Sequence, residues 1–306
     1  MNSLQRLLVG LDFTAMDETL IRYAAFLSAD INVREVYFVH VEKSLDVPEE
    51  LRSGLQKEHP GEHIRQLMLD KVDNYFNGRT GAQVEVLVKE GDPLKVLLKT
   101  SKELSIDTMM VGRKLRLKGS GVLAQKLLRT SHIGVMFVPE AFEPRLQRVV
   151  VSTDFSDYSA LALERVLHSS IYKQDLDLIC LHVYEVPTGY RTLGVSYEDF
   201  DQRMQRFAME KYEKLKERFP ELRQRGRLLL VRQEHQDIGE LIVLETKRAQ
   251  ADLLVVGARG KSAAAQFILG SITEKVLQLE IDIPLAVYKK ENENNSFLDS
   301  FLSSYY

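Results

Sequence analysis

The residues best suited to bind a ligand lie in a glycine-bearing stretch in the second half of the chain. A buried-strand run, Asp252 to Val256, ends in Gly257; Gly260 follows, and after nine residues comes Gly270-Ser271. Glycine permits positive φ and a close backbone approach, and a helix N-terminus offers free N–H groups and partial positive charge. The stretch therefore predicts a phosphate cradle. It is neither the P-loop, with Lys-Ser/Thr directly after its second glycine, nor the G-x-G-x-x-G fingerprint.

Charged and hydroxyl side chains accompany these glycines. Arg259 and Lys261 are placed to neutralise phosphate, and the alternative is that they are solvated loop cations. Ser262 and Ser271 are either hydroxyl donors to a ligand or plain helix caps. The residue types thus favour an anionic ligand but do not identify it.

The chain repeats itself once, which shows the elements that must position the cradle. The matching pairs are LLVGLDFT (7–14) with VVVSTDFS (149–156), FVHV (38–41) with CLHV (180–183), IDTMMVG (106–112) with ADLLVVG (251–257), and KLL (126–128) with KVL (275–277). The first two pairs share an offset of 142 residues. A period this long indicates a duplicated domain and not a solenoid.

Each copy reads as alternating strands and helices. In the second copy we expect strands at 147–152, 177–184, 227–232, 252–256 and 284–288, and helices near 157–172, 196–219, 236–249 and 271–280. Continuous Val/Ile/Leu runs are typical of parallel strands covered on both faces. Alternation with helices predicts a doubly wound α/β fold, and right-handed crossovers favour the strand order 3-2-1-4-5. We therefore expect two Rossmann-like α/β domains, each a five-stranded parallel sheet with helices on both faces.

The domain boundary is expected in the short stretch 139–144, where two prolines bracket a polar turn. The first domain would cover residues 1–141, the second 142–290, and a tail 291–306 would follow. Because the linker is short, the two domains should pack together. The apolar positions of FLDSFLSSYY in the tail favour a docked segment over a membrane or partner anchor.

In such sheets, ligands bind at the carboxyl ends of the strands, at the switch point between strands 1 and 4. Asp154, Val183 and Gly257 end the expected strands 1, 2 and 4 of the second copy. This arrangement predicts a nucleoside between Asp154 and Val183, with its phosphates running into the glycine stretch. Asp154 would accept hydrogen bonds from ribose hydroxyls or an amine; the alternative is a helix N-cap made by Asp154 or Ser156.

Together, these residues resemble a tandem universal stress protein over almost the whole chain. The resemblance rests on Asp154 followed by Phe-Ser, on His182-Val183, and on the G-x2-G-x9-G-S spacing that begins at Gly257. It implies flavodoxin-like domains that bind ATP, with Mg²⁺ as an option at Asp154 through the triphosphate. The implied nucleotide-binding residues are Thr153, Asp154, Val183, Val256, Gly257, Arg259, Gly260, Ser262, Gly270, Ser271 and Ile272. It further implies pairing of the two domains through their last strands, 133–138 and 283–289, or a homodimer.

The first copy departs from this pattern. Asp12, Val41 and Gly112 are in place, but only six residues (RKLRLK) separate Gly112 from Gly119-Ser120, and the middle glycine has no counterpart. The first copy should therefore not bind ATP in the family manner. Two interpretations stay open: a domain that keeps only a structural role, or one that holds a different anion with the cations of this loop.

Composition excludes several classes of protein. A net charge of −3 gives no overall reason to expect nucleic acid as a partner. No apolar run approaches the ~18 residues that span a bilayer, and the N-terminus has no signal-peptide pattern. The single cysteine, Cys180, rules out an internal disulfide and is expected to be a small buried hydrophobe. The cytoplasm is the default location.

No catalytic constellation is visible. His40 and His182 occupy matching positions, where a structural hydrogen bond is favoured over a metal. His59 and His63 are four apart, but Pro60-Gly61 between them argues against a shared helix face. Without a positioned base for attack on a γ-phosphate, the chain is at most a slow ATPase. The leading hypothesis is an ATP-binding regulatory protein with one nucleotide per chain, and the alternative is an interaction module with an unknown protein partner.

Overall fold

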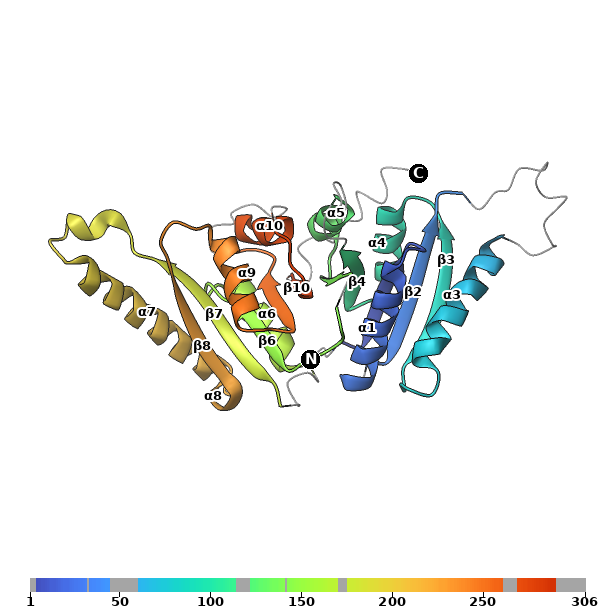
Figure 1. Cartoon of the computed structure of the whole chain (residues 1–306), viewed down its shortest axis with the longest axis horizontal. Helices are drawn as coiled ribbons and strands as arrows, with labels where there is room; N and C mark the ends of the chain where they lie inside the picture. The colour runs from blue at the N-terminus through green and yellow to red at the C-terminus, as the bar shows by residue number, and fades with distance from the viewer. Residues whose placement is uncertain are drawn as a thin grey trace. The chain divides into compact units, whose positions relative to one another are not determined.

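The computed structural model describes residues 4–31, 33–44, 60–113, 122–140, 142–169, 175–260 and 269–289. The chain divides into two compact units, and the boundary along the chain lies between Pro144 and Arg145. Each unit repeats the same succession of strands and helices, as the chain-order colours of Figure 1 show.

Unit 1 contains one five-stranded sheet. Its elements are β1 (Arg6–Leu11), α1 (Met16–Asp30), β2 (Glu35–Glu42), α3 (Pro60–Phe76), β3 (Gln83–Glu90), α4 (Pro93–Glu103), β4 (Thr108–Arg113), α5 (Val122–Thr130) and β5 (Gly134–Pro139). The strands are parallel and lie in the order β3-β2-β1-β4-β5. Pro60 and Gly61 begin α3, because proline is tolerated in the first turn of a helix.

Unit 2 repeats this arrangement. Its elements are β6 (Arg148–Ser152), α6 (Asp157–Leu167), β7 (Asp177–Glu185), the 3₁₀ turn η2 (Thr188–Arg191), α7 (Tyr197–Arg218), α8 (Leu222–Arg225), β8 (Gly226–Gln233), α9 (Ile238–Arg248), β9 (Leu253–Gly257), α10 (Ser271–Gln278) and β10 (Leu285–Tyr288). The parallel strands lie in the order β8-β7-β6-β9-β10. The predicted order 3-2-1-4-5 is therefore confirmed in both units. The sequence did not indicate η2 or α8.

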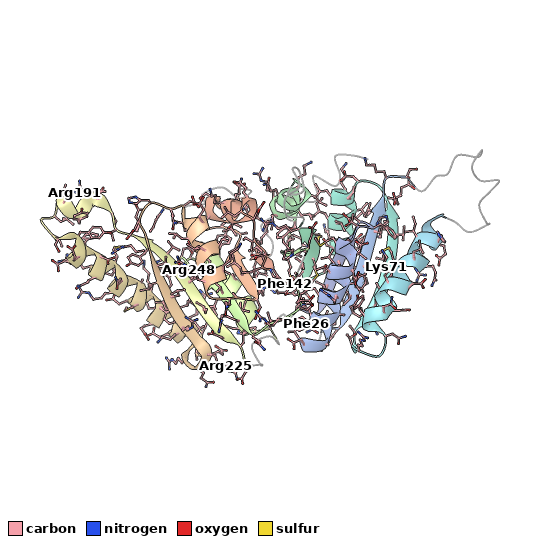
Figure 2. All side chains as sticks on the ribbon, in the orientation of Figure 1. Phe26, Lys71, Phe142, Arg191, Arg225 and Arg248 are labelled. Carbon is pink, nitrogen blue, oxygen red and sulfur yellow. The ribbon has the colours of Figure 1, made fainter. Side chains whose placement is uncertain are left out.

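Helices cover both faces of each sheet. Right-handed crossovers place α1 and α3 on one face of the first sheet and α4 and α5 on the other, and the helices of each pair are in contact. Side chains fill the space between sheets and helices (Figure 2). The middle of each central strand is buried: Val149, Val150 and Val151 of β6 have no exposed surface, as expected of parallel strands covered on both faces.

Cys180 belongs to this core. Its side chain has no exposed surface, and burial raises the pKa of the thiol to about 12. The thiolate is the reactive form of cysteine, so Cys180 packs as a small apolar residue, as the sequence predicted.

A repeated carboxylate holds the fourth strand of each sheet beside the first. Asp107 accepts hydrogen bonds from the backbone N–H groups of Gln5 and Arg6 at 2.9 and 2.8 Å. In unit 2, Asp252 accepts from Gln147 and Arg148 at 2.8 and 2.9 Å, and its other oxygen pairs with Arg145 at 2.5 Å. The clamp fixes the start of strand 4 relative to strand 1, and thereby the far ends of both strands, where the candidate site lies.

Candidate functional site

A cavity of about 260 Å³ lies at the carboxyl ends of β6 and β9, against the first turn of α10. Its described walls are Ser152, Asp154, Ser159, Val256, Gly257, Arg259, Gly260, Gly270, Ser271, Ile272 and Thr273. This is the switch point between strands 1 and 4 of the sheet, because β6 pairs with both β7 and β9.

Most of the residues predicted from the sequence meet at this cavity, and two do not. Thr153 is buried beside it, where its hydroxyl bonds to Ser159 Oγ at 3.2 Å and accepts the Phe155 N–H at 3.1 Å. Val183 is half-buried and is not part of the wall. Ser262 and Lys261 lie outside the described residues. The direct contact predicted for Val183 with a nucleoside stays a prediction.

Sequence reasoning missed three wall residues: Ser152, Ser159 and Thr273. Ser152 and Ser159 flank Asp154 in the string S-T-D-F-S-D-Y-S, so the density of small hydroxyl residues after strand 1 was the available signal. Thr273 is buried, and its hydroxyl donates to the Gly257 carbonyl at 2.9 Å. It ties the first turn of α10 to the end of β9.

The glycines are required by close packing around the cavity. A Cβ on Gly257 would lie 2.8 Å from the backbone of Tyr158, so β9 and α6 could not approach as they do. A Cβ on Gly260 would lie 2.9 Å from Asp154 Oδ2. Gly260 thus packs directly against the carboxylate of Asp154, to which the sequence analysis assigned a ligand-binding role. The glycine stretch and the turn after β6 are therefore in contact.

The N-terminus of α10 is built differently from those of the other long helices of unit 2. Helices α6, α7 and α9 are each capped by a side chain, from Ser156, Ser196 and Asp237. Gly270 occupies the same position of α10 and provides no side-chain cap, while Ser271 is the first helical residue and is exposed. Ser271 is therefore not the cap residue. Gly270 to Thr273 line the cavity at the start of α10, and Gly270 provides no capping side chain, which is an arrangement suited to an anion.

A cation is held at the cavity mouth. The Arg259 guanidinium donates to the Tyr158 hydroxyl at 3.1 Å and lies 5.6 Å from the centre of that ring. Tyr158 belongs to α6, so Arg259 is oriented before any ligand arrives. The cavity combines this oriented positive charge with the helix N-terminus.

The turn after strand 1 has the same unusual geometry in both units. Phe13 and Phe155 have φ of 59° and 60°, a region that bulky residues rarely adopt. Asp154 Oδ1 accepts from the Ser156 N–H at 3.0 Å and from its hydroxyl. Ser156, in turn, is the N-cap of α6. Asp154 therefore supports the turn with one oxygen while its other oxygen lies against Gly260.

The paired histidines make the structural hydrogen bond that the sequence favoured. His182 Nδ1 lies 2.7 Å from the Thr153 carbonyl, and His40 Nδ1 lies 3.1 Å from the Leu11 carbonyl. Each ring packs on the phenylalanine of its turn, with centroids 4.6 Å apart. These histidines hold strand 2 to the turn that carries the aspartate.

Among its described residues, the corresponding end of unit 1 differs from the unit 2 site. Helix α5 is described from Val122 onward, and the match of KLL (126–128) with KVL (275–277) aligns Val122 with Ser271. Under the turn, buried Asp17 takes the place of Ser159 and accepts from the Asp12 and Phe13 N–H groups at 2.9 Å each. Burial raises the pKa of the Asp17 carboxyl. Residues 114–121, which hold most of the basic loop, lie outside the described residues.

Among the described residues, no group of three or more His, Cys, Asp or Glu side chains gathers as metal ligands, and His59 lies outside them. In the same part of the chain, no helix has the length and apolar character needed to cross a bilayer.

Comparison with known proteins agrees with the duplicated architecture. A universal stress protein from Mycolicibacterium smegmatis is 22% identical over 289 residues, which cover 89% of this chain and 93% of the relative. A solved universal stress protein from Archaeoglobus fulgidus has the same fold, with a TM-score of 0.62, 17% identity and coverage of 93% and 98%. PA1789 from Pseudomonas aeruginosa reaches a TM-score of 0.67 at 12% identity, covering 98% of both chains. The model of the universal stress protein family matches residues 3–139 and 145–289, and the chain belongs to this family as a tandem of two such domains.

Proposed function

We propose that this universal stress protein binds one ATP per chain, in unit 2, and acts as a nucleotide-responsive regulatory protein. The observation that carries the proposal is the first turn of α10, whose residues line the cavity without a side-chain cap at Gly270. Phosphate oxygens are natural acceptors for such groups. Arg259, held by Tyr158, supplies a positive charge beside them.

The nucleoside would lie on the side of Asp154. Asp154 lines the cavity and its Oδ2 lies beside Gly260, where a ribose hydroxyl could donate to it. Asp154 is the one carboxylate among the described residues that line the cavity. Mg²⁺ would join through the triphosphate and this single carboxylate, because Mg²⁺ commonly keeps most of its water and phosphate ligands.

The proposal is tested by calorimetric titration of the full chain with ATP, with and without Mg²⁺, after nucleotide released by denaturation has been identified by mass spectrometry. We expect saturation near one equivalent per chain, and a melting temperature that rises with ATP concentration. AMP and cAMP are the competitors to compare, since one solved universal stress protein carries bound AMP and another is in complex with cAMP. If ATP, AMP and cAMP all give no heat of binding and no shift in melting temperature, the function would instead be that of an interaction module. Turnover of ATP measured alongside would identify a slow ATPase.

A further inference from the structure

A second cavity, larger than the first, lies in unit 1. Its volume is about 610 Å³, within the range of ~300 to 1,000 Å³ that is typical of small-molecule sites. It occupies the switch point of the first sheet, among β1, β2, β4 and the helices α1, α4 and α5; Figure 1 labels all of these except β1.

The walls of this cavity are aliphatic. They include Leu11 of β1, Met16 and Leu20 of α1, Leu97 of α4, Val111 of β4 and Leu123 of α5. Among the described residues that line the cavity, the aromatic ring is the His40 imidazole, which packs edge-on against Phe13, and no Phe, Tyr or Trp is present. Such walls favour a flexible aliphatic chain over a planar ligand.

The polar groups of the cavity are engaged with the protein itself. His40 Nε2 lies 2.8 Å from Glu42 Oε1, and its Nδ1 bonds to the Leu11 carbonyl. Asp12 Oδ1 accepts from the N–H and hydroxyl of Thr14 at 3.2 and 2.6 Å. The cavity therefore imposes little demand for a polar ligand, since these groups have their own partners.

Charge argues against a phosphate in the described part of the cavity. The carboxylates of Asp12 and Glu42 line it, Asp17 lies buried beneath the turn, and Lys43 is the single cation of the described wall. The cavity thus differs from its unit 2 counterpart in volume, in lining and in charge.

We propose that unit 1 is a second ligand site, which binds an aliphatic acyl chain and no nucleotide. The chain would lie along the walls formed by α1, β4 and α5, with its polar end toward Lys43 and the ends of β1 and β2. The protein then carries two ligand sites of different chemistry in one duplicated framework, and this proposal stands whether or not unit 2 binds ATP.

The test titrates the full chain with 11-(dansylamino)undecanoic acid, followed by fluorescence, with unlabelled fatty acids as competitors. We expect saturation near one equivalent, no displacement by ATP, and competition that strengthens by about twofold to fourfold per added methylene, as apolar burial requires. The methyl ester should compete somewhat more weakly than the acid, because it loses the charge that lies toward Lys43, but with the same dependence on chain length.

Two variants locate the site. Leu123 is 38% exposed, so Leu123→Glu should fold, place a charge on the apolar wall and weaken the probe by about tenfold or more. Leu67 of α3 is 44% exposed and does not line the cavity, so Leu67→Glu should leave binding unchanged. Gly10→Leu adds a side chain between Leu97 and Val111, which lie 3.5 to 3.8 Å from the added Cβ, and should also weaken the probe; its thermal melt checks folding.

Four results would overturn the proposal: no saturable binding, displacement by ATP, equal affinity of the two glutamate variants, or competition that does not depend on chain length. Binding that appears only after removal of residues 291–306 would do the same, because the tail would then be the natural occupant.

Discussion

Replacing Ser271 by aspartate separates helix stability from phosphate binding, because the two effects of the new charge have opposite signs. Ser271 is the exposed first residue of α10, and it lines the unit 2 cavity. A carboxylate in the first turn of a helix stabilises it by ~0.3 to 1 kcal/mol. The same carboxylate would lie beside any phosphate bound at that turn. Ser271→Asp should therefore keep or slightly raise the melting temperature of the free protein and impair ATP binding.

The size of the loss follows from Coulomb's law. For two unit charges ~5 Å apart, the repulsion is about 3 kcal/mol at an effective dielectric constant of ~20 and about 0.8 kcal/mol in the fully hydrated limit. The larger value corresponds to an increase of about 200-fold in the Kd for ATP, and the smaller value to an increase of about 4-fold. Because the triphosphate carries several charges, we expect the upper half of this range at low salt, and a smaller loss at ~1 M ionic strength, where the Debye length falls to ~3 Å.

The assay is calorimetric titration with ATP of the wild type, Ser271→Asp and Ser271→Asn, at two salt concentrations. Asparagine has the size of aspartate without its charge, so it should retain affinity within a few-fold. If the aspartate and asparagine variants bind ATP equally well, phosphate does not lie at the N-terminus of α10, and the proposed site is wrong.

Three further variants test other parts of the structure. Gly260→Ala places a Cβ 2.9 Å from Asp154 Oδ2 and should weaken ATP binding by about tenfold. Gly189→Ala is the control, because a Cβ there has no neighbouring atom within 4 Å, and it should leave ATP binding unchanged. Equal ATP affinities of the two variants would refute a role for the contact between Gly260 and Asp154. Tyr184→Phe removes a 2.8 Å hydrogen bond to buried Asp201 and should lower the free energy of unfolding by ~1 to 3 kcal/mol. Burial and this bond raise the pKa of Tyr184 from 10.0 to about 12 in the folded protein. Folding therefore favours the protonated hydroxyl, and the stability advantage of wild type over Tyr184→Phe should be complete below pH 10.0. This advantage should shrink as the pH rises to about 12. A pH-independent difference in chemical denaturation would contradict that assignment. Asp252→Ala leaves the Gln147 and Arg148 N–H groups and Arg145 without their carboxylate and should cost ~2 to 4 kcal/mol, measured by urea unfolding; a loss below ~0.5 kcal/mol would show that the clamp is not structural.

The sequence alone determined the duplicated α/β architecture, because the signals for it are local. Unbroken apolar runs such as Val149 to Val151 mark strands buried on both faces, and the alternation with helices leaves few topologies open. The same locality explains why Asp154, Gly257, Gly260 and Gly270 were found: each lies at or shortly after the end of a strand, or directly before a helix, and the ends of parallel strands meet at one edge.

Only the tertiary structure decided how those ends are used. Ser159 and Thr273 reach the cavity, whereas Thr153 turns to Ser159 and Val183 lies outside the wall, since the direction of a side chain at a strand end depends on its packing partners. The aliphatic cavity of unit 1 arises from side chains of β1, β4, α1, α4 and α5 that are far apart in the chain. Hydrophobic patterning identifies each of them as core, but a void forms where their packed volumes fail to meet, and that is a property of the assembled fold.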